Sequence, residues 1–385
     1  MSGSPIYLDY AASTPLDKRV LSAMEPYFHT DFYNPSALYQ SAREVRFAYE
    51  DARHQLAIAI GAKQHEIIIT AGATESINLA ISGVIGQYGG SVVVSRIEHA
   101  AVVETAQHHD VMWIEADHRG FITEAAVRSA ITDTTTIVSV GYINNELGTV
   151  QPLRAIAGVI DDIRKKRLAD GSTTPLFFHT DASQAPGLID ISVSRLGVDL
   201  MTLNSGKCYG PKQVGLLWVR AGIELTPLIY GGGQENGLRS GTENVAGTIG
   251  FATALTLCVK SKNSESHRIA QLRDQLQRTI IEAIPDIVVN GHPKQRSPHI
   301  LHISLAGLDG ERAVFALDEY GILAATGSAC AANKATRSHV LTAVGMSDEL
   351  ADGSVRLSLG RATTEADIER AGKIIIDVLQ QERGR

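Results

Sequence analysis

Short runs of apolar and β-branched residues alternate with longer helical patterns between about residue 65 and residue 221. Runs such as SVVVS (91–95) and TTIVSVGYI (135–143) indicate buried strands, whereas ATESINLAISGVIGQYG indicates a helix opened by Thr74 and Glu75. Further strands are predicted at 66–70, 111–117, 175–181, 199–204 and 215–221. This alternation predicts an α/β fold whose sheet is mostly parallel and flanked by helices.

The pattern changes after about residue 250, where one long helical segment is followed by short strands (HILHISLAG and SVRLSLG) and by helices. This change predicts a second, smaller α+β domain, and a chain of 385 residues is long enough for two cores. We expect the large domain to span residues 16–258 and the small domain to combine residues 1–15 with 259–385. A loop at about 324–337 is expected within the small domain.

The composition narrows the class of protein without identifying it. Hydrophobic residues make up 44% and charged residues 20% of the chain, which is typical of a globular protein. The 35 basic and 42 acidic residues give a net charge of −7, which argues against direct nucleic-acid binding. No apolar run approaches about 18 residues, so we expect a cytoplasmic protein that does not bind membranes. The three cysteines are far apart and predict neither a disulfide framework nor a metal site.

Polar residues fall at the points where predicted strands end. Thr74, His99 and Asn145 each follow a strand, and Asp181 and Lys207 close two more. Because the carboxyl ends of parallel strands line the ligand crevice of such sheets, we expect these five side chains to lie together. Packing alone is a poor explanation for five polar residues at one sheet edge.

Lys207, in LMTLNSGKCYGPKQVG, lies where an apolar strand runs into small residues. An amine in a partly desolvated pocket is the usual nucleophile toward a carbonyl, and pyridoxal phosphate (PLP) is the commonest cofactor that requires one. Asp181 is a candidate partner for the pyridine nitrogen, and GATES (72–76) offers backbone N–H groups and Thr74 to a phosphate. Taken singly, Lys207 could be a loop lysine, Asp181 a helix cap and His99 a satisfied polar residue.

A series of motifs runs along the chain in a fixed order. They are YLDYAASTP (7–15), NPSALY (34–39), TAGATESINLA (70–80), EHAAV (98–102), NNELGTVQP (144–152), HTDASQAPG (179–187), SGKCYGPK (205–212), RSGTENVAG (239–247), TGSACAANKATRSHVL (326–341) and SVRLSLGR (354–361). In this order, the chain resembles nearly end to end the cysteine desulfurases of the iron–sulfur-cluster and nitrogen-fixation type. These enzymes form part of the class V aminotransferase branch of PLP fold type I.

The resemblance implies roles around the cofactor ring. Lys207 would bind PLP covalently and move the Cα proton of the substrate. Asp181 would pair with the pyridinium nitrogen, and Gln184 would contact the ring hydroxyl. His99 would stack on the ring and act as an acid or base toward the substrate.

It also implies how the phosphate and the substrate are held. Thr74 and Ser205 would bind the phosphate, and Thr242 would reach the phosphate of the neighbouring subunit, which implies a homodimer. Asn145 and Arg356 would bind the substrate carboxylate, because the planar fork of arginine matches that group.

Cys330 lies in TGSACAANKA, a run of small residues that predicts a mobile loop. By the resemblance, its thiolate would attack the sulfur of bound L-cysteine, carry it as a persulfide and release L-alanine. His99 is the candidate base that assists the thiolate. The simpler interpretation is a buried structural thiol. Sulfur would pass to an acceptor protein, a scaffold or a sulfur carrier, for iron–sulfur clusters, thio-cofactors or tRNA thiolation, and a DNA-modification partner stays open as well.

The chain departs from the family pattern beside the lysine. The family usually has a Ser-Gly-His-Lys run, whereas this chain has Asn204-Ser205-Gly206-Lys207. A phosphate contact is therefore expected to be lost or moved. Tyr39 stands where the family commonly has histidine, and the chain ends soon after Arg361, where iron–sulfur-cluster members have a longer tail that docks the scaffold.

Two other functions remain open from the sequence. One is a selenocysteine lyase or another PLP-dependent β-elimination or aminotransferase enzyme, which would need no acceptor thiol at Cys330. The other is a PLP-fold scaffold without catalytic activity. The sequence does not decide between cysteine and selenocysteine as substrate.

Overall fold

The structure is a computed structural model that describes residues 4–327 and 337–384. Its largest sheet has seven strands in the order β2-β8-β7-β6-β5-β3-β4. These strands are β2 (Ile67–Thr70), β3 (Ser91–Ser95), β4 (Val111–Ile114), β5 (Thr135–Ser139), β6 (Phe177–Asp181), β7 (Leu200–Asn204) and β8 (Gly215–Val219). Strand β8 pairs antiparallel with both of its neighbours, and all other pairs are parallel. The predicted α/β fold with a mostly parallel sheet is confirmed.

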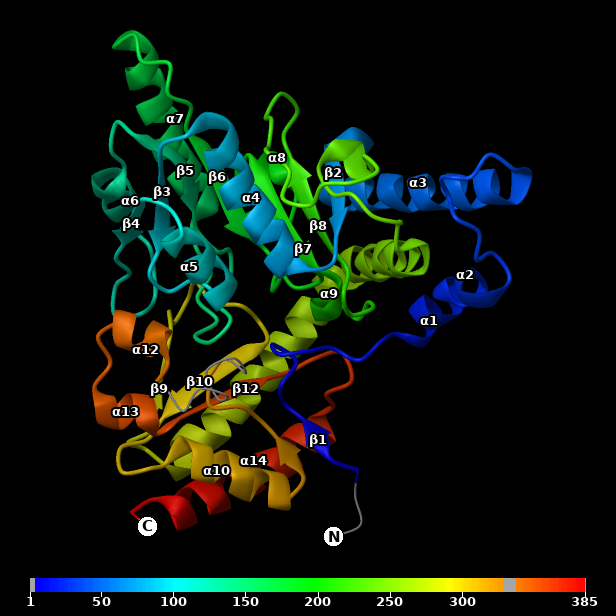
Figure 1. Cartoon of the computed structure of the whole chain (residues 1–385). Helices are drawn as coiled ribbons and strands as arrows, with labels where there is room; N and C mark the ends of the chain where they lie inside the picture. The colour runs from blue at the N-terminus through cyan, green and yellow to red at the C-terminus, as the bar shows by residue number, and fades with distance from the viewer. Residues whose placement is uncertain (1–3, 328–336, 385) are drawn as a thin grey trace.

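Helices cover both faces of this sheet (Figure 1). They include α3 (Gln40–Ile60), α4 (Ala73–Tyr88), α5 (Ala100–Gln107), α6 (Glu124–Ala130), α7 (Leu153–Ala169) and α8 (Val193–Leu196). Strand β3 shows how one strand contributes to a buried cluster on each face of the sheet, because successive side chains of a strand point to opposite faces. Val92 and Val94 pack in one buried cluster with Ile77 of α4, whereas Val93 packs in the other with Ile156 of α7. A strand buried on both faces is apolar along its middle, as the three valines of SVVVS are.

A second region lies below the large sheet in Figure 1 and contains both ends of the described chain. Its three-stranded sheet has the order β12-β10-β9, from Ser354–Ser358, Ile300–Ser304 and Val288–Val289. Around it lie β1 (Ile6–Tyr7), β11 (Ile322–Leu323), α10 (Gly310–Glu319), α12 (His339–Ala343), α13 (Asp348–Asp352) and α14 (Glu365–Glu382). A third buried cluster joins Ile6 and Leu8 to Leu357 and Ile375, so the first residues complete this core.

Helix α9 (Val245–Ala283) links the two regions, because it contacts both α3 and α14. The predicted domain boundary at residue 258 falls inside this unbroken helix, and the boundary itself stays a prediction. Helices α1 (Lys18–Met24) and α2 (Pro26–His29) lead from the first residues to α3. Within the described residues, we find no helix that combines the length and apolarity needed to cross a bilayer.

Strand β5 is shorter than the sequence predicts. The run TTIVSVGYI predicts a strand to residue 143, but β5 ends at Ser139. The chain then turns back on itself, with an isolated bridge between Ile143 and Val150. Asn144 holds this turn, because its Oδ1 accepts hydrogen bonds from the backbone N–H groups of Glu146 (3.0 Å) and Leu147 (2.8 Å). The turn leaves the sheet at the edge where the candidate site lies.

Candidate active site

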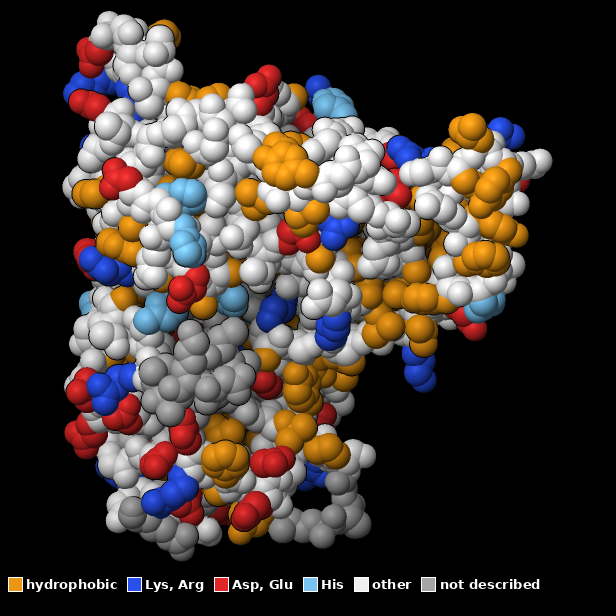
Figure 2. Space-filling view, viewed as in Figure 1, with side chains coloured by type: hydrophobic (Ala, Val, Ile, Leu, Met, Phe, Trp, Pro, Cys, Tyr) orange, Lys and Arg blue, Asp and Glu red, His pale blue; other side chains and the backbone are white. Residues whose placement is uncertain are grey.

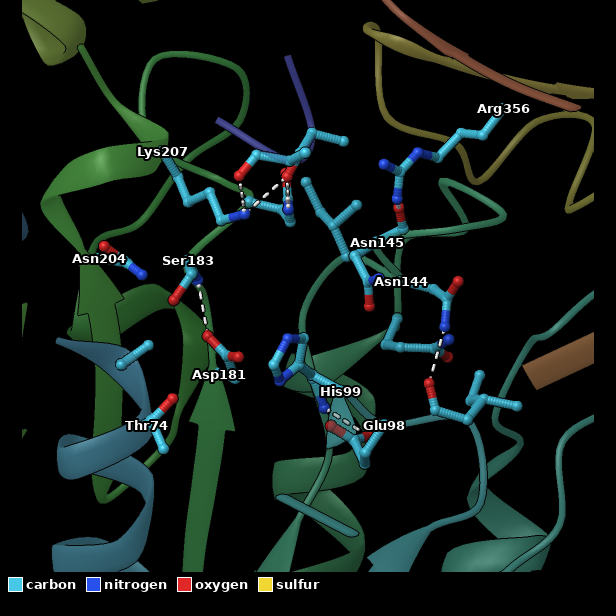
Figure 3. A pocket seen from close by; sticks show the side chains of 18 residues that line it. Thr74, Glu98, His99, Asn144, Asn145, Asp181, Ser183, Asn204, Lys207 and Arg356 are labelled. Atoms are coloured by element: carbon cyan, nitrogen blue, oxygen red, sulfur yellow. Dashed lines mark hydrogen bonds between the residues drawn. The ribbon is translucent and has the colours of Figure 1, made fainter. Parts of the chain in front are cut away.

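A cavity of about 260 Å³ opens at the carboxyl edge of the large sheet. Seven residues predicted from the sequence line it together: Thr74, His99, Asn145, Asp181, Gln184, Lys207 and Arg356. Figure 3 shows Lys207 and Arg356 reaching in from opposite sides, with Asp181 and His99 between them. The strands bring most of these side chains to one place, as the sequence predicts, while Arg356 comes from β12 of the small sheet.

Lys207 ends a short 3₁₀ turn, η2 (Ser205–Lys207), that directly follows β7. Its Nζ donates hydrogen bonds to the backbone oxygens of Ala11 (2.7 Å) and Ala12 (2.6 Å). The first residues of the chain therefore hold the amine at the cavity wall. Sequence reasoning missed Ala11 and Ala12, because a backbone carbonyl carries no side-chain signal.

Asp181 closes β6 and lines the cavity. Its Oδ1 accepts a hydrogen bond from the backbone N–H of Ser183 at 2.9 Å. Its Oδ2 has no hydrogen bond within the described residues and is left for a ligand. The arrangement gives a fixed carboxylate with one oxygen to offer a cationic ring nitrogen.

His99 caps the start of α5, where its Nδ1 accepts a hydrogen bond from the backbone N–H of Ala101 at 3.1 Å. The neutral imidazole consequently carries its proton on Nε2. Burial lowers the pKa of His99, the charge of Asp181 opposes this, and the charges of Lys207 and His339 lower it further. His99 is thus a neutral group that can donate from Nε2.

Glu98 and Glu146 are buried acids that the sequence reasoning did not single out. Glu98 is 5% exposed, lines the cavity and accepts a hydrogen bond from the backbone N–H of Gly141 at 2.8 Å. Burial raises the pKa of Glu98 to about 7, partly offset by its hydrogen bonds and reinforced by the charge of Asp181. Burial also raises the pKa of Glu146, whose Oε2 accepts a hydrogen bond from Ser338 Oγ at 2.6 Å. In the sequence, Glu98 and Glu146 are marked only as acidic residues within the motifs EHAAV and NNELGTVQP.

Hydrogen-bond donors lie at the end of the cavity where α4 begins. Helix α4 begins here behind Gly72, with no side chain capping its first N–H groups, and Thr74 lies in its first turn. Ser183 Oγ is buried without a partner in the described residues, and Ser183 lines the cavity. Open N–H groups at a helix start and unpaired hydroxyls favour an anion.

Asn204 lines the cavity, whereas Ser205, which the resemblance assigns to the phosphate, does not. The Oδ1 of Asn204 accepts the backbone N–H of Gly206 at 3.0 Å, which leaves its Nδ2 as a donor. Ser205 is fully buried and would lie 2.1 Å from a Cβ placed on Gly210. Because the lysine fixes the register, Asn204 is three residues before Lys207, where the family run has its serine.

Gly206 stands where the family run has histidine. A Cβ at Gly206 would lie 3.1 Å from Cδ of Lys212, so the lysine stem occupies the space of the missing side chain. Lys212 Nζ donates to the backbone oxygen of Thr14 at 2.5 Å. The histidine contact is therefore replaced by packing that ties η2 to the first residues.

Arg356 is 1% exposed and lies in the middle of β12. Its Nη1 donates to the backbone oxygen of Asn145 at 2.9 Å, and its Nη2 donates to Asp9 Oδ1 at 2.7 Å. Its Nε is buried without a partner in the described residues. A guanidinium with one unpaired donor at a cavity wall can bind a carboxylate.

Gln184 faces the cavity from the segment after β6. Its Nε2 donates to the backbone oxygen of Ala11 at 2.9 Å, and its Oε1 lies 3.4 Å from His299 Nε2. Burial, with the charges of Arg356, Arg273 and Lys207, lowers the pKa of His299 to about 3. A neutral His299 that donates from Nε2 fixes the amide so that its nitrogen faces Ala11.

Thr242, like Ser205, is not among the residues that line this cavity. It is exposed and lies in the segment before α9. Cys330 lies outside the residues that the structure describes, as does most of the predicted loop at 324–337.

An amine, a carboxylate, an anion-binding helix start and a buried guanidinium around one cavity define a lysine-centred enzyme site on an α/β sheet. Residues 6–371 match the family described as Aminotransferase class-V, and the chain belongs to that family. The resemblance inferred from the motifs is confirmed.

Relatives and solved structures agree with this assignment. A cysteine desulfurase IscS of Dictyoglomus turgidum is 39% identical over 98% of this chain and 94% of its own length. Cysteine desulfurase IscS 1 of Archaeoglobus fulgidus is 38% identical, with 98% and 97% covered. A solved NifS-like protein superposes with a TM-score of 0.89 at 29% identity, with 98% of this chain and 100% of that one covered. SspA in complex with cysteine gives a TM-score of 0.77 at 35% identity, with 92% and 98% covered.

Proposed function

We propose that the protein is a cysteine desulfurase, which converts L-cysteine to L-alanine and transfers the sulfur to Cys330 as a persulfide. The observation that carries this proposal is the convergence of Lys207, Asp181 and Arg356 on one cavity. That set fits an amino acid held by its carboxylate beside a reactive amine. Relatives that span nearly the whole chain are cysteine desulfurases, which supports the same activity.

The residues fit pyridoxal phosphate as the cofactor. The start of α4, Thr74, the unpaired Ser183 Oγ and Asn204 Nδ2 would bind its phosphate. Asp181 Oδ2 would pair with the ring nitrogen, and Lys207 would hold the cofactor covalently. When bound, PLP supplies an electron sink for a carbanion at Cα.

The protein's own groups then carry the proton chemistry. The Lys207 amine would take the Cα proton, because it reaches into the cavity that would hold the substrate. His99 stays neutral, because burial lowers its pKa. Its imidazole would stack on the ring, and its Nε2–H would donate a hydrogen bond toward the substrate. Gln184, held by His299, would contact the ring hydroxyl.

Arg356 and Asn145 would bind the substrate carboxylate at the far side of the cavity. The unpaired Nε of Arg356 offers one donor, and Asp9 keeps the guanidinium plane in place. Asn145 lies on the turn after β5, which Asn144 holds rigidly. Fixing the carboxylate between these groups orients the Cα–H bond toward the lysine.

Cys330 would act as the sulfur acceptor on the strength of the motif TGSACAANKA and of the family resemblance. A cysteine thiolate attacking the sulfur of the substrate forms an S–S bond as the C–S bond of the substrate breaks. The electron pair of the C–S bond stays on the Cβ carbon, which takes up a proton to complete L-alanine. The sulfur then passes to an acceptor protein, a scaffold or a sulfur carrier. We expect this transfer to take place in the cytoplasm, where thiols stay reduced.

A homodimer would bring Thr242 to the phosphate of the partner. Large apolar side chains are exposed on α1, α2, α3 and the segment 30–39 that joins α2 to α3, a part of the chain that projects from the molecule (Figure 2). They include Leu21, Phe28, Phe32, Leu38, Tyr39 and Phe47. Arg46 on α3 lies 3.5 Å from Glu243, so the segment with Thr242 adjoins this apolar surface. Such a patch on a protein surface favours association.

The experiment incubates the PLP-loaded protein with L-cysteine and follows alanine and the mass of the protein. We expect alanine to form and the mass to rise by about 32 Da, one sulfur atom, at Cys330. The variant Cys330→Ser should form neither persulfide nor alanine. Alanine or sulfide released at the full rate by Cys330→Ser would contradict the persulfide route and favour an elimination or selenocysteine-directed enzyme.

A further inference from the structure

Two buried thiols, Cys208 and Cys258, lie close to Lys207. Cys208 directly follows Lys207, and Cys258 lies in α9, fifty positions further along the chain. Their exposures are 0% and 1%, and Cys258 Sγ donates to the backbone oxygen of Cys208 at 3.3 Å. Cys208 Sγ donates to the backbone oxygen of Ser205 at 3.4 Å, and the contact between the two thiols raises the pKa of Cys208 and lowers the pKa of Cys258.

Arg361 gives the Cys258 sulfur a cationic partner. A cysteine that only packs in the core does not need one. The Nη2 of Arg361 lies 3.4 Å from Cys258 Sγ, and its Nη1 pairs with Asp17 at 2.9 Å. The guanidinium also lies over the ring of Tyr209, 4.2 Å from the centroid. An arginine held in this way stabilises a thiolate, which is the reactive form of cysteine.

Cys258 also lines a small cavity of about 30 Å³. Lys207 and Gln184 line both this cavity and the larger one, so the small cavity lies directly behind them. A cavity of this volume has room for a water-sized molecule, for which about 10–15 Å³ suffices. A small peroxide is of the size that such a space admits, whereas a peptide disulfide such as oxidised glutathione is far too large.

We propose that Cys208 and Cys258 form an oxidisable thiol site that takes hydrogen peroxide and closes to a disulfide. The Cys258 thiolate attacks one peroxide oxygen, and the O–O bond breaks. Cys258 becomes a sulfenic acid, and the other oxygen takes up a proton and leaves as the first water. The Cys208 sulfur then attacks the sulfenic sulfur, the S–S bond forms, and the second water leaves. Two thiols are oxidised and one peroxide is reduced to two waters. The bond ties the turn that carries Lys207 to α9.

The test uses the PLP-loaded Cys330→Ser variant, in which Cys208 and Cys258 are the remaining cysteines of the sequence. Hydrogen peroxide should lower its mass by about 2 Da, dithiothreitol should restore it, and peptide mapping should find the linked pair. Oxidised glutathione should leave the mass unchanged. The readout is independent of turnover, so it does not depend on the desulfurase activity.

A double variant, Cys330→Ser with Cys258→Ser, is the matched control and should not lose about 2 Da under peroxide. Two results would overturn the proposal. One is an unchanged mass of the Cys330→Ser variant in peroxide, and the other is addition of oxygen to Cys258 that dithiothreitol does not reverse. Mapping is done on the Cys330→Ser variant alone, so the conclusion stands even if the double variant folds poorly.

Discussion

The two walls of the cavity are built in different ways. One, the sheet-edge wall, consists of residues that follow strands of the large sheet, among them Asp181 and Lys207. The other, the arginine wall, consists of Arg356 on the small sheet and Asp9, which is 347 positions away in the chain. The side chains of the first wall come from one region of the chain, residues 74–207, whereas the second wall depends on segments from near the two ends of the chain meeting.

This difference indicates a division of labour. The sheet-edge wall collects the groups that fit the cofactor, each at the end of a strand whose position is fixed by a buried core. The arginine wall holds a single cationic group between Asp9 and the backbone of Asn145. Substitutions in the first wall should therefore change cofactor binding or protein stability, and those in the second should change substrate binding.

The largest effect is expected for Arg356→Lys, measured on PLP-loaded protein. Lysine keeps the charge but loses the planar fork, so kcat/KM for L-cysteine should fall by about 100-fold, mostly through KM. The cofactor absorbance should not change. The control Asp9→Asn leaves the fork in place and should cost less than about tenfold. A loss of cofactor from Arg356→Lys, with KM unchanged, would break the division between the two walls.

The next effect is the pH dependence of stability caused by Glu98 in the sheet-edge wall. Its pKa is raised from 4.5 to about 7, so the unfolded chain releases this proton first as pH rises. The contribution of Glu98 is therefore most favourable below about pH 4.5 and is lost as pH rises toward 7. Because glutamine does not ionise, Glu98→Gln removes this loss of stability.

We expect the stability of Glu98→Gln relative to the wild type to increase by about 2 kcal/mol between pH 5 and pH 7, measured by urea unfolding. The control Glu104→Gln changes an exposed acid on α5 and should show no such trend. A flat difference for Glu98→Gln would mean that this acid is already ionised in the folded protein at pH 5.

The smallest effect separates Asn204 from Ser205. Asn204→Ala should weaken PLP retention by about tenfold, because one hydrogen bond to a charged phosphate is lost. Ser205→Ala should change it by less than about twofold, because Ser205 does not line the cavity. Retention is measured by dialysis and absorbance. If Ser205→Ala instead weakened PLP retention more than Asn204→Ala, the phosphate contact would belong to Ser205.

The fold and most of the site could be predicted from the sequence. Apolar runs such as SVVVS define strands that are buried on both faces, and parallel strands bring their carboxyl ends together. For that reason His99, Asp181 and Lys207 could be expected at one edge, and they are found there. Arg356 could be assigned only through the family motif, because nothing local in SVRLSLGR connects it to the large sheet.

The rest depends on contacts that leave no pattern in the sequence. The carbonyl oxygens of Ala11 and Ala12 accept from Lys207, but any residue presents such an oxygen. The family resemblance assigns the phosphate contact to Ser205, whereas the register relative to Lys207 favours Asn204. The Cys208–Cys258 contact joins a strand end to a helix across many residues, and the spacing of cysteines says nothing about it.

The hydrogen bonds from Lys207 to the first residues of the chain bear on any attempt to dissect the protein. A fragment of residues 16–258 would retain every strand of the seven-stranded sheet, yet it would lack both carbonyls that steady the amine. Separating the two halves would leave the Lys207 amine without these hydrogen-bond acceptors. The smallest autonomous working unit therefore includes the amino-terminal segment as well as the sheet.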